Sequence, residues 1–161
     1  MKIKIKHLVV IILLIVFGGI AISNYAGLWK TQSDKIPKKV FSFDGQEIYD
    51  PTDIKGSYTF SDVSKFFDIP LEDLAKAFGL NGSVAENFKC KDVKTIKTVS
   101  QGATLSMDSV RYFVIFYKGI KADLKEDVYL PAPAKEIIIN KGTPLKEQIE
   151  YLDKHLIGIE W

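Results

Sequence analysis

The run from Leu8 to Trp29 constrains the fold most, because it contains no charged side chain. An α-helix of that length spans about 33 Å, close to the thickness of the hydrocarbon core of a bilayer. Tyr25 and Trp29 stand near the end of the run, where aromatic side chains anchor a helix at the membrane surface. The sequence therefore predicts a single-pass membrane protein with a transmembrane anchor over residues 8–29.

Three lysines, Lys2, Lys4 and Lys6, lie in the short basic tail that precedes this run, residues 1–7. Because lysine is enriched on the cytoplasmic side of membrane helices, the tail is expected in the cytoplasm and the C-terminal part outside it. The alternative is a signal peptide cleaved after the small-x-small sequence at residues 21–23. Both interpretations export the rest of the chain.

The composition excludes several classes of partner and site. The chain has 22 basic and 20 acidic residues and a net charge of +2, so no broad positive field is expected to attract nucleic acid. Cys90 is the only cysteine, which excludes an intramolecular disulfide and any iron–sulfur or zinc site built from cysteines of one chain. An exported domain of this kind must be stabilised by its core.

The exported part begins with a polar linker over residues 30–39, followed by a globular domain over residues 40–161. Asp44-Gly45 is typical of a type I′ turn and predicts a β-hairpin at the start of the domain. Its two arms would carry the apolar side chains of Val40, Phe41, Phe43, Ile48 and Tyr49.

Two short helices are predicted next, in "GSYTFSDVSKFFDIPLEDLAKAFGL". Thr59 and Asp62 have the spacing of a capping box, and Pro70 suits the first turn of the second helix. Gly79 is placed to end that helix. The helical spacing assigns these apolar residues to buried faces: Phe60, Val63, Phe66, Phe67, Leu71, Leu74, Ala75 and Phe78.

Three further helices are predicted towards the C-terminus. The first begins at Ser106 or Asp108 and ends at Gly119, the second runs from about Pro133 to Gly142, and the third starts with Thr143 as N-cap. The segment 81–104 is compatible with a short helix around Phe88 or a strand through Val93, Ile96 and Val99. The expected fold class is α+β, mainly helical.

No motif for catalysis, metal binding or cofactor binding is present in the sequence. We expect His7 and His155 at surfaces, and Cys90 as a half-buried residue whose flanking lysines are the one feature that would favour a thiolate. Glu72 and Asp73 are adjacent in a predicted helix and are expected on its solvated face. The sequence therefore favours a non-catalytic role without a cofactor.

Two regions are candidates for binding a protein partner. Arg111 is the only arginine, and its planar guanidinium is suited to bidentate recognition of a carboxylate or phosphate, although pairing with Asp108 is the alternative. Tyr112 and Phe116 belong to the same aromatic helix, which is apolar on all sides and must be buried against something on each face. Phe60 and Asp62 mark the second candidate region, the helix pair over residues 60–78.

A resemblance adds to this interpretation. "DPTDIKGSYTFSDVSKFFDIPLEDLAKAFGL", "FKCKD", "DSVRYFVIFYKG" and "YLPAPA" resemble an uncharacterised module that forms a tail on, or stands beside, polyferredoxin-type iron–sulfur membrane proteins of anaerobic bacteria. The resemblance covers roughly residues 50–134 and implies an accessory of membrane-bound electron transfer. Because the cysteine motifs of the cluster-bearing relatives are missing here, it implies association with redox machinery and not electron carriage.

A second resemblance is to the LysM domain, in which a strand is followed by two helices and a second strand. "YTFSDVSKFFDIPLEDLAKAFGLN" is similar to its core, although "GSYTF" replaces the usual Gly-Asp before the first helix. LysM domains bind cell-wall glycan, so peptidoglycan is the alternative partner. The expected function is thus a membrane-anchored accessory module with a membrane-protein partner, or a wall-binding domain.

Overall fold

The computed structural model describes residues 12–19, 36–41, 47–99 and 102–160. The chain divides into two compact units, Met1–Lys35 and Ile36–Trp161. In the first unit the structure describes one helix, over residues 12–19. No helix within the described ranges is long and apolar enough to cross a membrane. The rest of the predicted anchor, including Tyr25 and Trp29, lies outside the described residues, so the anchor stays a prediction.

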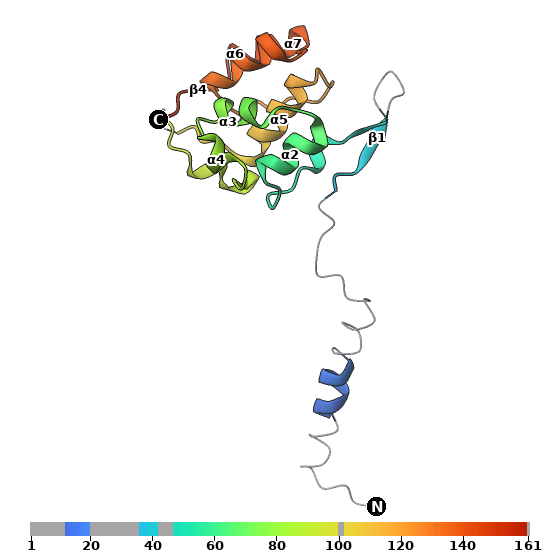
Figure 1. Ribbon diagram of the computed structural model, residues 1–161. Coiled ribbons are helices and arrows are strands. Elements are labelled where there is room, and N and C mark those ends of the chain that lie inside the picture. Colours follow the sequence, from blue (N-terminus) through green and yellow to red (C-terminus); the bar gives the residue numbers. More distant parts are fainter. Residues whose placement is uncertain (1–11, 20–35, 42–46, 100–101, 161) are drawn as a thin grey trace, which may run out of the picture. The chain divides into compact units, whose positions relative to one another are not determined.

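The second unit has an α+β fold made mostly of short helices, which confirms the predicted class (Figure 1). Its elements, in chain order, are β1 (Lys39–Phe41), β2 (Glu47–Tyr49), the 3-10 helix η1 (Pro51–Asp53), α2 (Phe60–Phe67), α3 (Leu71–Ala77), α4 (Gly82–Ala85), the 3-10 helix η2 (Cys90–Thr95), α5 (Met107–Tyr117), β3 (Leu130–Pro131), α6 (Ala132–Lys141), α7 (Lys146–Leu152) and β4 (Leu156–Ile157).

The predicted hairpin is confirmed by the antiparallel pairing of β1 with β2, in which Val40 is opposite Ile48. The proposed turn, Asp44-Gly45, lies outside the described residues. Tyr49 attaches the hairpin to α2, since its ring meets those of Phe66 and Phe67 edge-on, with centroids 5.4 and 6.4 Å apart. β3 and β4 form a second, parallel pair.

The α2–α3 pair follows the sequence prediction closely. The Asp62 N–H donates to Thr59 Oγ1 at 3.1 Å, and the Thr59 N–H donates to Asp62 Oδ2 at 2.9 Å, which completes the predicted capping box. Phe60 is fully buried, and its ring meets those of Phe78 and Phe88 with centroids 5.2 and 5.3 Å apart. The apolar faces of the two helices therefore form one part of the core.

We predict that Thr59→Ala lowers the free energy of unfolding by about 1 kcal/mol, because it removes the side-chain acceptor at the start of α2. Thr59→Ser keeps the hydroxyl group and should lose less than half of that amount. Chemical denaturation followed by circular dichroism measures both. A serine variant as unstable as the alanine variant would show that the hydroxyl group is not what matters.

α5 is the helix around which the unit packs. Figure 1 shows it near the centre of the unit, and it contacts α6, η1, η2 and β3. Five of its successive side chains, Tyr112 to Phe116, are buried. The prediction that this helix is covered on every side is therefore confirmed, and what covers it is the rest of its own unit.

Of the two alternatives for the segment 81–104, its described residues form helix, as α4 and η2, and no strand through Val93. Two local predictions are wrong. α7 starts at Lys146 with Leu145 extended before it, and not after Thr143, because the Thr143 N–H instead donates to the Tyr117 carbonyl at 2.9 Å. His155 is buried, with its ring stacked 3.9 Å from that of Tyr151.

Candidate functional site

An apolar groove of about 780 Å³ lies in the described part of the second unit. One wall is the β1–β2 hairpin, and the other is the chain that leaves the C-terminal end of α5. The apolar residues that line it come from segments far apart in the sequence: Val40, Phe41, Ile48, Pro51, Ile115, Ile120, Ala122 and Leu145. A concave apolar surface of this kind is typical of a binding site.

The wall after α5 depends on a close approach between backbones. Gly119 ends α5 with a φ of 62°, and the Ile120 N–H then donates to the Ile115 carbonyl at 2.9 Å. Gln148, from α7, donates from Nε2 to the Ile120 carbonyl at 2.8 Å. These contacts fix the segment after α5 against the start of α7, which brings Leu145 into the groove.

The hairpin wall is unusually exposed. Phe41 is 79% exposed and Val40 is 38% exposed, although both are large apolar residues. Exposed apolar side chains beside a groove mark a surface for interaction with another molecule more often than isolated ones do. The groove is thus an apolar surface that the described part of this chain does not cover.

The charged side chains at the groove are mostly basic. Lys118 donates to the Asp68 carbonyl at 3.0 Å, while Lys121 is exposed and forms no ion pair with any residue that the structure describes. Asp50 also lines the groove, but its carboxylate accepts hydrogen bonds from the backbone and side chain of Thr52 at 2.8 and 2.7 Å. Both donors are neutral, so Asp50 keeps its negative charge, and Lys118 also lies 3.9 Å from the Asp68 carboxylate. The residues that line the groove thus carry two basic side chains against one carboxylate.

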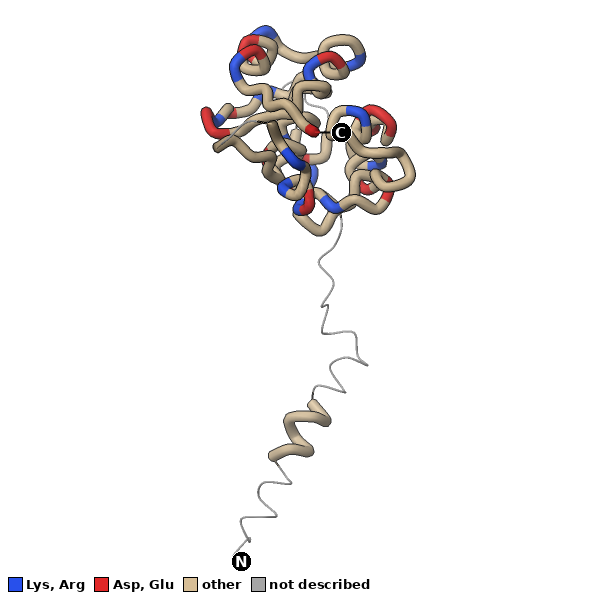
Figure 2. Tube along the Cα trace, turned by 90° about the vertical axis from the view of Figure 1, so that its left-hand side faces the viewer, with Lys and Arg blue, Asp and Glu red and all other residues tan. Residues whose placement is uncertain are grey.

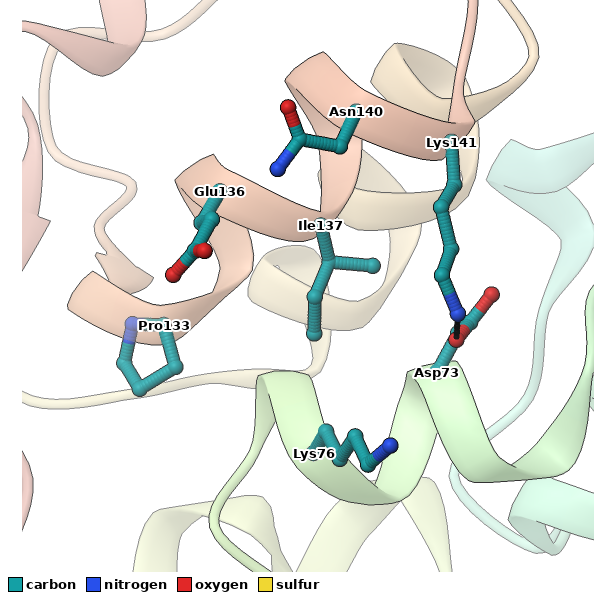
Figure 3. A pocket seen from close by; sticks show the side chains of 7 residues that line it. All are labelled: Asp73, Lys76, Pro133, Glu136, Ile137, Asn140 and Lys141. Carbon is teal, nitrogen blue, oxygen red and sulfur yellow. Dashed lines mark hydrogen bonds and ion pairs between the residues drawn. The ribbon is translucent and has the colours of Figure 1, made fainter.

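A smaller polar pocket of about 300 Å³ lies between α3 and α6 (Figure 3). Figure 3 shows the side chains of Ile137 and Lys141 directed from α6 towards α3, where Lys141 meets Asp73, while the Lys76 side chain lies along α3. The prediction that Asp73 lies on a solvated face is wrong, because α6 packs on α3 and leaves Asp73 fully buried. Glu72, its neighbour, is exposed and pairs with Lys76 at 2.6 Å.

Asp73 has partners for both of its carboxylate oxygens. Lys141 donates to Oδ1, and the Tyr117 hydroxyl donates to Oδ2 at 3.1 Å. Burial, and then the hydrogen bond to this carboxylate, raise the pKa of Tyr117 above its usual range. Because these groups satisfy each other, the pocket offers a ligand no unpaired buried charge, and the groove is the stronger candidate site.

We predict that Lys141→Met lowers the free energy of unfolding by about 2 kcal/mol, since it leaves the buried Asp73 carboxylate with one hydrogen bond and no cation. The double variant Asp73→Asn, Lys141→Met should recover part of this loss, because the remaining amide is neutral. Chemical denaturation of the single and double variants measures the coupling. If the single and double variants lose the same free energy of unfolding, the buried charge of Asp73 is not the cause.

Arg111, the first predicted partner-binding residue, is engaged within the fold. Its Nε and Nη2 donate to the Ile54 carbonyl at 3.2 and 2.7 Å, and its Nη1 donates to Asp108 Oδ1 at 2.7 Å. The guanidinium group of Arg111 therefore joins α5 to the end of η1. Although burial acts to raise it, the pKa of Asp108 is held below its usual range by Arg111, with help from Lys125.

The lowered pKa of Asp108 predicts that the stability of the fold depends on pH. A depressed folded-state pKa stabilises the fold above the unfolded-state value of about 3.9, and the contribution disappears as the pH falls through the folded-state value. We expect Asp108→Asn to lower the free energy of unfolding by about 1–2 kcal/mol at neutral pH and by progressively less below about pH 4. Denaturation curves of both proteins across that range test this, and a pH-independent difference would contradict it.

The other predicted partner-binding residues lie in the α2 and α5 helices. Phe60, Tyr112 and Phe116 are buried in the core of this structure, so their rings form no surface for a partner. Asp62 belongs to the capping box of α2. None of these residues, nor Arg111, lines the groove. The groove was missed because its lining comes from four separate segments, and no local pattern links them.

Neither Cys90 nor His155 forms a reactive site. Cys90 is fully buried, and burial raises the pKa of its thiol to about 12, so the flanking lysines do not produce a thiolate. His155 Nδ1 lies 2.9 Å from the Tyr151 carbonyl and therefore carries the proton that this carbonyl accepts. Within the described ranges, no group of three or more His, Cys, Asp or Glu side chains is placed to hold a metal ion.

Comparison with known proteins returns no relative: no family model, no curated protein and no solved structure matches this chain.

Proposed function

We propose that the second unit is a non-catalytic binding module, held outside the cytoplasm by the predicted anchor over residues 8–29, that docks a membrane-protein partner in the groove. The observation that carries this proposal is the apolar groove of about 780 Å³ with Phe41 79% exposed at its edge. A groove of this size with an apolar lining and a basic rim is suited to a protein segment.

Two further observations support a role in binding. Figure 2 shows basic and acidic residues interspersed along the trace of the second unit, so no single-sign surface favours nucleic acid. Among the described residues, the side chains of Asp62, Asp73, Arg111 and His155 are also engaged in contacts within the fold. The likeness to modules found beside iron–sulfur membrane proteins makes a membrane redox complex the first partner to test.

The test is co-purification of the tagged full-length chain from native membranes in mild detergent, with mass spectrometry and a visible absorption spectrum. We expect a stoichiometric membrane protein that is lost with Phe41→Glu and retained with Val84→Glu, an equally polar change at another exposed apolar position. Iron–sulfur or flavin absorbance in the complex would support the redox assignment. A protein recovered alone, or a partner retained by both variants, would overturn the proposal.

Binding of cell-wall glycan is the second candidate, and one feature of the fold favours it. Thr59 forms an antiparallel bridge with Lys89, flanked by hydrogen bonds from the Phe60 N–H to the Phe88 carbonyl at 2.9 Å and from the Cys90 N–H to the Tyr58 carbonyl at 2.8 Å. Helices α2, α3 and the short α4 lie between the two paired segments. This is the strand–helix–helix–strand order expected for a LysM domain with one additional short helix before the second segment. Sedimentation of the full-length chain with purified wall material tests this candidate.

A further inference from the structure

β1 contributes Val40 and Phe41 to the groove, and on its edge away from β2 no described strand pairs with its backbone groups. The Asp50 N–H donates to the Lys38 carbonyl at 2.8 Å, which extends the β1–β2 register by one pair. Because hydrogen-bonded and non-hydrogen-bonded pairs alternate in an antiparallel ladder, Val40 and Ile48 are the next bonded pair. The N–H and C=O groups of Lys39 and Phe41 therefore point away from β2.

No other strand pairs with β1 among the residues that the structure describes. A strand edge of this kind is a template for a further extended chain, since its donors and acceptors are already spaced for a ladder. The side chains of Val40 and Ile48 share one face of the hairpin, and both line the groove. A strand added at β1 would present every second side chain on that same face.

The chemistry of the groove defines the chain that fits this edge. Its floor is apolar, with Ile115, Ile120 and Leu145, so the alternate side chains of the added strand should be apolar. Lys118 and Lys121 stand against one carboxylate, Asp50, among the residues that line the groove, so the lining is net positive, although Lys118 also lies 3.9 Å from the Asp68 carboxylate. Acidic side chains are therefore favoured between the apolar ones.

We infer that the groove binds an extended segment of the partner protein, with alternating apolar and acidic side chains, which adds to the free edge of β1 as a third strand. This inference rests on the proposed function, because it specifies how the partner is held there. The backbone hydrogen bonds of Lys39 and Phe41 supply affinity, and the groove selects the apolar side chains.

A matched pair of variants isolates the backbone contribution. Phe41→Pro removes the outward-pointing N–H, whereas Phe41→Val removes the ring but keeps that N–H. Proline at this position costs no hydrogen bond of the β1–β2 ladder, since Phe41 does not donate to β2. Valine and proline are similar in size and apolarity, so the difference between the two variants reports mainly on the N–H.

The probe is a blocked synthetic peptide that alternates valine with aspartate and threonine, titrated into the full-length chain in mild detergent. We expect Phe41→Pro to bind about tenfold more weakly than Phe41→Val, corresponding to one hydrogen bond. A peptide of the same composition with its valines in one block should not bind. Replacing aspartate with lysine in the alternating peptide should weaken binding by at least about tenfold.

Amide hydrogen exchange provides a second measurement on the unmutated chain. Bound peptide should slow exchange at Lys39 and Phe41 and leave Val40, which is already in the ladder, almost unchanged. Equal affinities of the two Phe41 variants, or no change in exchange at these amides, would overturn strand addition. If no peptide binds while a membrane partner still co-purifies through Phe41, the strand mode fails and the proposed function stands. If no peptide binds and no membrane partner co-purifies, both strand addition and the proposed function are overturned.

Discussion

Replacing Phe113 with alanine is expected to lower the free energy of unfolding by about 3–5 kcal/mol. Phe113 is fully buried in α5, and its ring meets those of Phe78 and Tyr117 with centroids 5.9 and 5.8 Å apart. Truncation would remove the contact of α5 with Phe78, at the end of α3, and would leave a cavity there. Since domains of this size are stable by about 5–15 kcal/mol, much of the stability should be lost.

Chemical denaturation of the full-length chain measures this change. Val99→Ala is the control, because Val99 is 65% exposed and its truncation should change the stability by less than about 0.5 kcal/mol. A loss below about 1 kcal/mol for Phe113→Ala would mean that α5 does not organise the core. The assignment of the aromatic residues to core packing, and not to a partner surface, would then have to be withdrawn.

Gly119→Ala is expected to lower the free energy of unfolding by about 3 kcal/mol or more. The φ of 62° disfavours any residue with a Cβ, and a Cβ built there would lie 2.2 Å from the Thr143 carbonyl oxygen. That oxygen belongs to the backbone, so it can withdraw only if the chain before α7 moves. The change would also displace Leu145 and open the groove.

Gly82→Ala is the matched control, because a Cβ there meets no atom within 4 Å and the residue begins helix α4. It should leave stability unchanged or raise it by up to about 1 kcal/mol. The same denaturation experiment covers both variants. Similar stabilities for Gly119→Ala and the unmutated chain would contradict the close approach of α5 to the start of α7.

The parts of the fold that the sequence predicts well are those with strong local signals. The capping box of Thr59 and the stop at Gly119 depend on residues close together in the chain, and the structure has both. Strands β1 and β2 pair as expected for a hairpin. In each case the deciding interaction lies within a few residues, so sequence spacing is enough. Pro70 stands one position before its predicted place, as the N-cap of α3.

The errors arise where distant segments decide the environment. Asp73 is buried because α6, which is far along the chain, packs over α3 and supplies Lys141. α7 starts later than its apparent cap because Thr143 bonds to the end of α5 instead. For Arg111 the alternative of pairing with Asp108 is confirmed, whereas its bonds to the Ile54 carbonyl, just after η1, follow from no sequence pattern.

The groove was even harder to predict from the sequence, because distant segments form it. From the sequence pattern alone, each apolar residue that lines the groove is indistinguishable from an ordinary core or strand residue. Only the packing of the hairpin against the end of α5 leaves Phe41 exposed and forms a cavity beside it. The basic rim, with Lys118 and Lys121, likewise belongs to a segment that ends a helix and carries no motif.

The most direct test of partner binding in the groove is photo-crosslinking in intact cells. A photoreactive amino acid would replace Lys121, at the groove, or Val84, an exposed apolar residue outside it. We predict one dominant crosslinked membrane protein for the variant at position 121 and none for the variant at position 84. No crosslink at position 121, or the same proteins from both positions, would contradict binding in the groove.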